Sequence, residues 1–306
     1  MLILLCEYNN NLVTLFFRKF YLRSFKMRKS LITFAVLGAL SASSFAFAAE
    51  KETKSDFTTS GSVGLFSQYI FRGLTQTDRR AALQGNFDIN HSSGLYLGAW
   101  ASNVSWPRDT VAGAQPYSSG GSLEIDIYGG FKTDLGKSGF GVDLGALQYY
   151  YPGKENPANA GGNPKLNTTE LYGAINYHWV QAKISGVVSK DAWGFGKYGD
   201  GSGNDADGTY YAELNANVPI GEYMGAGNLK GLTGLLHIAR QDFRGSANSP
   251  ASYNDWKLGL QNTFDSGVII GAYYTDTNIK NDNVLWVYNS NNIGRETGTV
   301  FLQKTF

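Results

Sequence analysis

Leu123-Glu124-Ile125-Asp126-Ile127-Tyr128-Gly129-Gly130-Phe131 decides the fold, because apolar and polar residues alternate along this stretch. Successive side chains of a β-strand point to opposite faces, so the alternation predicts a strand with one apolar and one polar face. The same pattern recurs at 81–90 and at 168–179. The chain is therefore expected to be built from amphipathic strands.

Working outward from this stretch, we predict twelve strands separated by clusters of Gly, Pro, Asn and Asp. No run of 18 apolar residues and no convincing helical periodicity follows residue 49, so no membrane-spanning helix is expected. The predicted strands are 61–72, 81–90, 94–106, 121–133, 139–151, 168–179, 181–190, 209–218, 230–242, 253–264, 267–277 and 295–306.

Long and short connections alternate between these strands. The long ones are predicted at 73–80, 107–120, 152–167, 191–208, 243–252 and 278–294, and the connection at 219–229 is the exception among the short ones. Short periplasmic turns and long extracellular loops are typical of outer-membrane barrels, which have an even number of strands in bacteria. We therefore predict an all-β fold, a transmembrane antiparallel up-and-down β-barrel of about 12 strands, with both termini in the periplasm.

Composition excludes several other classes of protein. Gly accounts for 38 of 306 residues and Tyr and Phe for 19 and 18, whereas charged residues are 17% and the net charge is +1. Disordered chains need low hydrophobicity and high net charge, and nucleic-acid binding needs a basic surface. A mean hydropathy of −0.24 argues against a polytopic helical membrane protein. One Cys and three His are too few for a disulfide framework or a Cys/His metal cluster.

The first 48 residues resemble a targeting segment. Arg28 and Lys29 precede an apolar stretch at 31–40, and Ala46-Phe47-Ala48 is a small-residue cleavage site, which together indicate a secretory signal peptide at 27–48, cleaved after Ala48. Residues 1–26 are interpreted as an annotation extension upstream of a true start at Met27, or as a long positively charged n-region. The mature barrel is expected at 49–306.

Cleavage removes the single Cys and changes the charge of the chain. The remaining 258 residues contain 20 basic and 24 acidic residues, a net charge of −4, and no Cys follows the cleavage site as a lipoprotein would need. The chain ends in Thr299-Val300-Phe301-Leu302-Gln303-Lys304-Thr305-Phe306. A terminal aromatic residue on an amphipathic strand predicts that Phe306 is read by the outer-membrane insertion machinery.

Several motifs resemble the TorF family of porin-like bacterial outer-membrane proteins. They are Phe66-Ser67-Gln68-Tyr69-Ile70-Phe71-Arg72-Gly73-Leu74-Thr75-Gln76-Thr77, Ala82-Leu83-Gln84-Gly85, 94–104, 124–130 and 149–153, in that order. The resemblance extends from about Gly61 to Phe306 and is more specific before Asp191. It implies an outer-membrane barrel in a family whose solutes are poorly defined, and it supplies no catalytic residues.

If the apolar faces contact lipid, the polar faces line the interior. Charges cost up to about 4 kcal/mol in lipid, so they are expected inside the barrel or at its rims. Six acids against three bases predict a weak preference for cations; the alternative is that these charges pair and fill a narrow lumen. The predicted lumen residues are Arg72, Asp88, Glu124, Asp126, Asp143, Glu170, Lys183, Glu213 and Lys257.

Aromatic residues gather near the predicted strand ends, where interfacial girdles are expected and a sugar-stacking track is the alternative. They are Tyr69, Phe71, Trp106, Tyr149, Tyr150, Tyr151, Trp179, Trp193, Tyr210 and Trp256.

No catalytic or metal-binding pattern emerges from the sequence. Glu124 and Asp126 share a strand face, but a polar lumen places carboxylates in this way by default. His91, His178 and His237 lack partners at ligand or triad spacing, and His178 is expected to face the lumen. The loop 200–208 fails the EF-hand pattern. We expect no enzyme activity, cofactor or metal.

The function expected from these observations is an outer-membrane porin, a channel for passive diffusion of small hydrophilic solutes. Its expected partners are these solutes, outer-membrane lipids and the insertion machinery, with no nucleic acid. The alternative is a non-conducting barrel that acts as a surface-binding or structural protein through its long extracellular loops.

Overall fold

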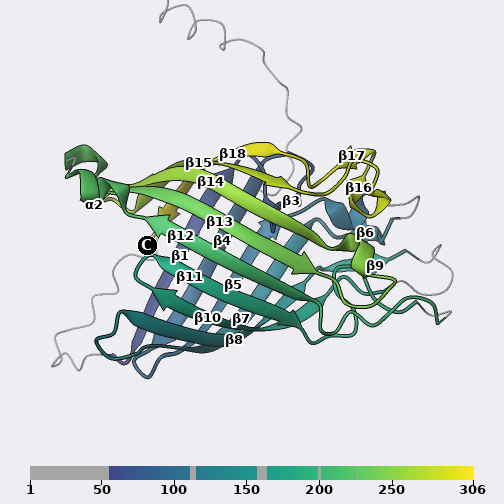
Figure 1. Ribbon diagram of the computed structural model, residues 1–306, viewed down its shortest axis with the longest axis horizontal. Coiled ribbons are helices and arrows are strands. Elements are labelled where there is room, and N and C mark those ends of the chain that lie inside the picture. The colour runs from purple at the N-terminus through teal and green to yellow at the C-terminus, as the bar shows by residue number, and fades with distance from the viewer. Residues whose placement is uncertain (1–54, 111–114, 157–163, 199–200, 226) are drawn as a thin grey trace, which may run out of the picture. The chain divides into compact units, whose positions relative to one another are not determined.

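The structure, a computed structural model, describes residues 55–110, 115–156, 164–198, 201–225 and 227–306. Twelve long strands form one closed antiparallel barrel (Figure 1). The expected signal peptide and start at Met27 lie outside the described residues. In chain order the barrel strands are β1 (Phe57–Phe66), β4 (Ala82–His91), β5 (Leu95–Asn103), β7 (Leu123–Asp134), β8 (Phe140–Tyr150), β10 (Thr168–Tyr177), β11 (Val180–Val187), β12 (Tyr210–Val218), β13 (Leu232–Asp242), β14 (Tyr253–Thr263), β15 (Val268–Thr277) and β18 (Thr297–Thr305).

These strands confirm the predicted fold. Eleven of the twelve begin and end within three residues of their predicted positions. The prediction for the first strand was wrong at both ends, because β1 begins at Phe57 rather than at residue 61 and ends at Phe66 rather than at residue 72. Arg72 and Gly73 have φ values of 48° and 79°, a left-handed conformation that no strand continues through.

The connections alternate in length as predicted. At one end of the barrel, the short-turn end, four connections span 92–94, 135–139, 178–179 and 264–267, and 219–231 contains the helix α2 (Ile220–Met224) and the 3₁₀ turn η2 (Gly227–Leu229). The opposite end, the long-loop end, has the segments 67–81, 104–122, 151–167, 188–209, 243–252 and 278–296. Figure 1 shows α2 and the labelled strands β6, β9, β16 and β17 at opposite ends of the barrel.

Short elements order the long-loop end. Three two-stranded sheets pair β2 (Ile70–Phe71) with β3 (Leu74–Thr75), β6 (Tyr117–Gly120) with β9 (Gly153–Glu155), and β16 (Val287–Tyr288) with β17 (Asn291–Asn292). Three 3₁₀ turns are η1 (Trp106–Arg108), η3 (Ser249–Ala251) and η4 (Val284–Trp286). Among the described residues, no helix combines the length and apolar character needed to cross a membrane.

The outer face of the barrel is apolar. On β7, Ile127 is 54% exposed whereas Glu124 on the opposite face is 1% exposed, which is the result of the alternation in sequence. Closure pairs the strands all the way around, so this apolar face has no unpaired strand edge and suits contact with lipid. Other outward apolar side chains include Leu65, Leu83, Phe87, Leu97, Leu144, Leu171, Ile175, Ile184, Ile238, Leu258, Ile270 and Val300.

The first and last strands close the barrel. Beyond their ladder, the Gly61 and Phe306 backbones exchange two N–H to carbonyl hydrogen bonds, each 3.0 Å long. A Cβ at Gly61 would lie 2.8 Å from the Phe306 ring, so glycine lets the terminal aromatic ring lie against β1. The C-terminal residue therefore takes part in closing the sheet.

Candidate functional site

The segment 67–81, which we call the inner segment, folds across the interior of the barrel near the long-loop end. It contains the small β2–β3 hairpin, whose turn holds Arg72 and Gly73. Arg72 donates from Nη2 to Oε2 of Glu170 on β10 at 2.8 Å and from Nη1 to Oε1 of Gln241 on β13 at 2.8 Å. One side chain of the inner segment therefore joins two strands that are not neighbours in the barrel.

Glycine allows the turn of the inner segment to approach the wall. A Cβ at Gly73 would lie 2.7 Å from Cβ of Asp255 and 2.7 Å from Cγ2 of Thr277, and the φ of 79° disfavours any other residue. The Tyr253 hydroxyl donates to the Arg72 carbonyl at 2.9 Å. The turn is thus held against β14 and β15.

The rest of the inner segment reaches the opposite wall. The Tyr69 hydroxyl donates to Oε1 of Glu124 on β7 at 3.0 Å. The Phe71 ring lies edge-on to Tyr149 of β8, with ring centroids 5.6 Å apart. Because its contacts extend from β7 to β15, the inner segment narrows the lumen across much of its width.

The charges around Arg72 and Tyr69 favour the position of the inner segment in the lumen. Arg72 and Glu170 are 7% and 1% exposed, so the pair is shielded from solvent. Burial alone lowers the pKa of Arg72, but the Glu170 carboxylate beside it more than compensates, and the net pKa is raised. Burial, followed by the charge of Glu124, holds the pKa of Tyr69 well above its usual value. Arg72 is therefore a permanent cation, and Tyr69 a neutral donor, over the physiological pH range.

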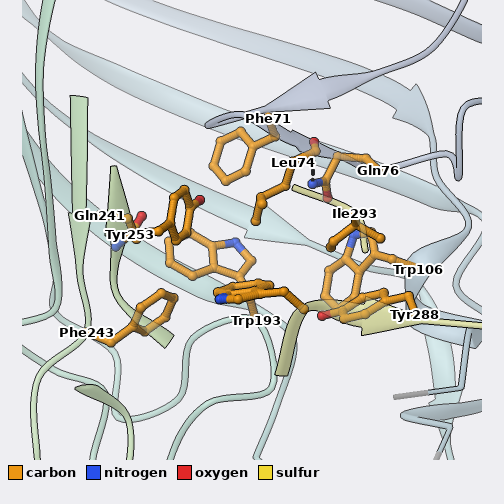
Figure 2. A pocket seen from close by; sticks show the side chains of 11 residues that line it. Phe71, Leu74, Gln76, Trp106, Trp193, Gln241, Phe243, Tyr253, Tyr288 and Ile293 are labelled. Atoms are coloured by element: carbon orange, nitrogen blue, oxygen red, sulfur yellow. Dashed lines mark hydrogen bonds between the residues drawn. The ribbon is translucent and has the colours of Figure 1, made fainter. Parts of the chain in front are cut away.

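Apolar side chains from all six long segments, the inner segment included, form one cluster at the long-loop end. We call this cluster the apolar cap, and its members come from every long-loop connection: Tyr69, Phe71, Leu74, Trp106, Tyr117, Tyr151, Leu166, Trp193, Phe195, Phe243, Trp286, Tyr288 and Ile293. Figure 2 shows several of these side chains around a small pocket of about 40 Å³. The cap covers the long-loop end of the lumen.

The apolar cap corrects the expectation of interfacial girdles for six residues. Tyr69, Phe71, Trp106, Tyr149, Tyr151 and Trp193 face the interior and pack in or against the cap. Three other residues of the predicted girdles, Tyr150, Trp179 and Trp256, are exposed on the outside, where a girdle residue belongs. Inward packing prevails because the loops fold over the barrel mouth and supply apolar partners, which local sequence does not reveal.

Two polar cavities occupy the lumen. The first, of about 230 Å³, lies beside Arg72 and is lined by Lys183, Glu213 and Lys257 among others. The second, of about 410 Å³, is lined by Asp88, Asp126 and Asp143. Lys183 lines both cavities, so they adjoin at this residue.

The structure places eight of the nine predicted lumen residues on inner faces of barrel strands: Asp88, Glu124, Asp126, Asp143, Glu170, Lys183, Glu213 and Lys257. The inner segment contacts two of them, Glu124 through Tyr69 and Glu170 through Arg72. The ninth residue, Arg72, also faces the lumen but was expected on a strand and lies in the β2–β3 turn. The run Tyr69-Ile70-Phe71 consists of residues that favour strands, so the local sequence conceals the turn that follows it.

Sequence reasoning missed a cluster in the first cavity. Nε2 of His237 on β13 lies 3.0 Å from Oδ1 of Asp255 on β14, and the Tyr211 hydroxyl donates to Oδ2 of Asp255 at 3.0 Å. His237 has no partner at ligand or triad spacing in the sequence, but strand pairing brings it to Asp255, 18 positions away. His178, expected in the lumen, is exposed in a short turn with a φ of 51°. The alternation of apolar and polar residues along β13 and β14 was the available signal, because it places His237 and Asp255 on the inner faces of these strands.

The chain matches a protein-family model in sequence and resembles several solved structures. A family model described as a bacterial protein of unknown function (Gcw_chp) matches residues 50–306. Among proteins of curated function, none matches the chain in sequence.

Three solved structures resemble the chain at low identity. The KdgM porin is 10% identical with a TM-score of 0.42, over 81% of this chain and 99% of its own. Outer membrane phospholipase A from Escherichia coli is 12% identical with a TM-score of 0.37, over 81% and 88%. The outer membrane protein opdK from Pseudomonas aeruginosa is 13% identical with a TM-score of 0.32, over 74% and 57%.

Proposed function

The chain belongs to the bacterial Gcw_chp family, whose function is unknown, and we propose that it is an outer-membrane channel for passive diffusion of small hydrophilic solutes. The observation that carries the proposal is the contrast between the two faces of the barrel. Its outside is a continuous apolar surface, whereas its inside holds two polar cavities lined by charged side chains. A polar, hydrated interior within an apolar wall is the arrangement of a membrane channel.

The inner segment sets the size of the solutes in this proposal. Twelve strands lie between the eight that leave room only for side chains and the 16–18 of open porins. The inner segment reduces the lumen further, through the contacts of Tyr69 and Arg72 with opposite walls. The cavity of about 410 Å³ lies in the size range of small-molecule sites. We therefore propose a narrow passage rather than a general diffusion pore.

Charge gives the proposed channel a weak cation preference. The two lumen cavities, with the two acids that the inner segment contacts, contain seven acidic and four basic residues, a formal excess of three acids. Excess carboxylate in a hydrated pore attracts cations. The acids are Asp88, Glu124, Asp126, Asp143, Glu170, Glu213 and Asp255, and the bases are Arg72, Lys132, Lys183 and Lys257.

The loop lengths support an orientation in the membrane. Outer-membrane barrels have short periplasmic turns and long extracellular loops, so we propose that the short-turn end, with both ends of the barrel sheet, lies in the periplasm. Phe306 is proposed as the residue read during insertion, and outer-membrane lipids as the partners of the apolar face. Cleavage after Ala48 and membership of the TorF family, on the motifs quoted above, remain parts of this proposal.

A second candidate function is favoured by the apolar cap. All six long segments contribute to one cluster that covers the mouth of the barrel, which is what a non-conducting barrel with a structured outer surface would have. Such a protein would bind a partner or stabilise the membrane through its loops. No step of enzymatic catalysis enters either proposal.

Solute uptake by proteoliposomes separates the two candidates. The protein is purified from the outer-membrane fraction of an expressing bacterium and reconstituted, and swelling rates are measured with a series of neutral solutes of increasing mass. The channel predicts swelling that falls steeply with solute size, whereas the non-conducting barrel predicts the rate of empty liposomes. Heat-modifiable migration in gels verifies that the barrel is folded in both cases.

A further inference from the structure

We propose that the second lumen cavity is a binding site for small zwitterionic solutes, which carry both an ammonium and a carboxylate group. The inference rests on the proposed channel function, because a site inside the lumen has a role only if solutes enter it. It names the chemical class of solute that the channel recognises.

The cavity contains a carboxylate that lacks a donor. Asp126 on β7 is 8% exposed, and its Oδ1 is buried without a hydrogen-bond partner among the described residues. The other two carboxylates of the cavity are already bound: Asp88 accepts from the Tyr128 hydroxyl at 2.6 Å and Asp143 from the Tyr96 hydroxyl at 2.6 Å. A buried acceptor without a donor costs free energy that a bound ammonium group recovers.

The same cavity contains an ammonium group that lacks an acceptor. Lys183 on β11 lines the cavity but forms no ion pair with any residue in the described ranges. Its Nζ lies 4.6 Å from the centroid of the Tyr172 ring, a contact that leaves its N–H donors free for a bound carboxylate. Asp126 and Lys183 thus line one cavity without forming an ion pair with each other.

The remaining lining suits an organic ligand rather than a metal ion. Aromatic rings of Tyr96, Trp100, Tyr128 and Tyr172 surround the cavity, and Lys132 lies over the Tyr96 ring at 5.0 Å. Such rings attract ammonium groups, as the two lysines already show. No group of three His, Cys, Asp or Glu side chains suited to a metal ion occurs in the described part of the chain. A solute with both charges offers a donor to Asp126 and an acceptor to Lys183, two groups of this lining that lack such partners among the residues that the structure describes.

Binding to the purified, detergent-solubilised protein tests this inference without requiring conduction. Saturation-transfer NMR and calorimetry are performed with 4-aminobutyrate as the zwitterion, and with butyrate and butylamine at the same ionic strength. We expect saturable binding of 4-aminobutyrate, with butyrate and butylamine binding at least about tenfold more weakly, the effect of losing one charge-assisted contact of about 1.4 kcal/mol.

Variants identify the site. Asp126→Asn and Lys183→Met are each expected to weaken 4-aminobutyrate binding at least about tenfold. Asp265→Asn and Lys230→Met carry the same charge changes in an exposed pair 3.1 Å apart at the short-turn end, and they should leave binding unchanged. Retained binding in the first two variants, comparable binding of butyrate or butylamine, or no saturable binding at all would overturn the inference. Saturable binding by a protein that fails to conduct would instead contradict the channel alone.

Discussion

Nη2 of Arg72 lies 2.8 Å from Oε2 of Glu170, and this pair links the inner segment to the barrel wall at a point where both side chains are almost fully buried. Arg72 lies in a turn and Glu170 on a strand, so the ion pair helps to hold the turn in the lumen, together with the hydrogen bond from the Tyr253 hydroxyl to the Arg72 carbonyl. Gln241 on the far side receives a second hydrogen bond from the same guanidinium. The proposed constriction depends on these contacts.

Replacing Arg72 by Met should release the inner segment and destabilise the barrel. Removing one partner of a buried ion pair leaves the other charge unpaired and costs about 3–5 kcal/mol. The free energy of unfolding in urea measures this loss. Arg80→Met serves as the control, because Arg80 is 65% exposed and 3.8 Å from Asp78, and an exposed pair is worth about 0–1 kcal/mol. Equal losses in the two variants would show that Arg72 is not held as described.

Replacing Gly73 by Ala tests the close approach of the inner segment to the wall. The new Cβ would lie 2.7 Å from atoms of Asp255 and Thr277, and overpacking of this kind costs about 1–3 kcal/mol. Gly136→Ala is the matched control, since Gly136 also has a positive φ, of 62°, but has nothing within 4 Å of its Cβ position. Its cost is limited to backbone strain, about 1–2 kcal/mol. Urea unfolding should show the larger loss for Gly73→Ala, and the opposite order would contradict the packing.

Neutralising one lumen carboxylate should reduce cation preference. Asp143→Asn keeps an acceptor for the Tyr96 hydroxyl but removes one of the excess negative charges. One charge about 8 Å from an ion in water changes its local concentration about twofold, so the cation-to-anion permeability ratio should fall by about that factor. Reversal potentials in a salt gradient give the ratio. Asp265→Asn, outside the lumen, should leave it unchanged, and an anion-selective wild type would refute the charge assignment.

Stability should fall at alkaline pH because tyrosines outside the barrel strands have raised pKa values. Burial raises the pKa of Tyr117 to about 12, and the pKa of Tyr69 lies well above its usual value through burial and Glu124. A raised folded-state pKa gives stability that is fully present below the unfolded value near 10 and is lost as pH rises through the folded value. Each such tyrosine contributes a slope of about 1.4 kcal/mol per pH unit.

Unfolding in urea at pH 9 to 12 measures this slope. Tyr69→Phe should lower stability at pH 9, because Glu124 loses a donor, and should reduce the slope above pH 10 by one tyrosine. Tyr223→Phe, at an exposed position in α2, should keep the wild-type slope. Equal slopes in all three proteins would contradict the burial of the Tyr69 hydroxyl.

Local pattern predicted the strands well and the interior poorly, for a physical reason. The position of β7 follows from alternation within its own residues, because each strand face meets one environment along its length. The start of the inner segment contains Tyr69, Ile70 and Phe71, which favour a strand, yet Tyr69 and Phe71 find their apolar partners in the cap. Those partners come from loops distant in sequence, so local pattern predicted the connection at 73–80 but did not distinguish residues 67–72 from a strand.

The His237–Asp255 contact shows the same limit for the candidate site. Alternation places both side chains on inner faces, but their proximity depends on the register between β13 and β14, which pairs His237 with Lys257 and so places Asp255 diagonally opposite. Arg72 and Glu170 are 98 residues apart and meet only because the inner segment enters the lumen. Sequence indicated which charges face inward but not which of them meet.

Single-channel recording in a planar bilayer tests the central claim most directly. The wild-type protein is compared with a variant in which residues 69–79 are replaced by a Gly-Ser linker, both verified as folded barrels. The account predicts discrete conductance steps in the wild type and larger steps in the variant, because the inner segment narrows the lumen. The absence of conductance steps from both folded proteins, or equal conductance in the two, would contradict a channel constricted by the inner segment.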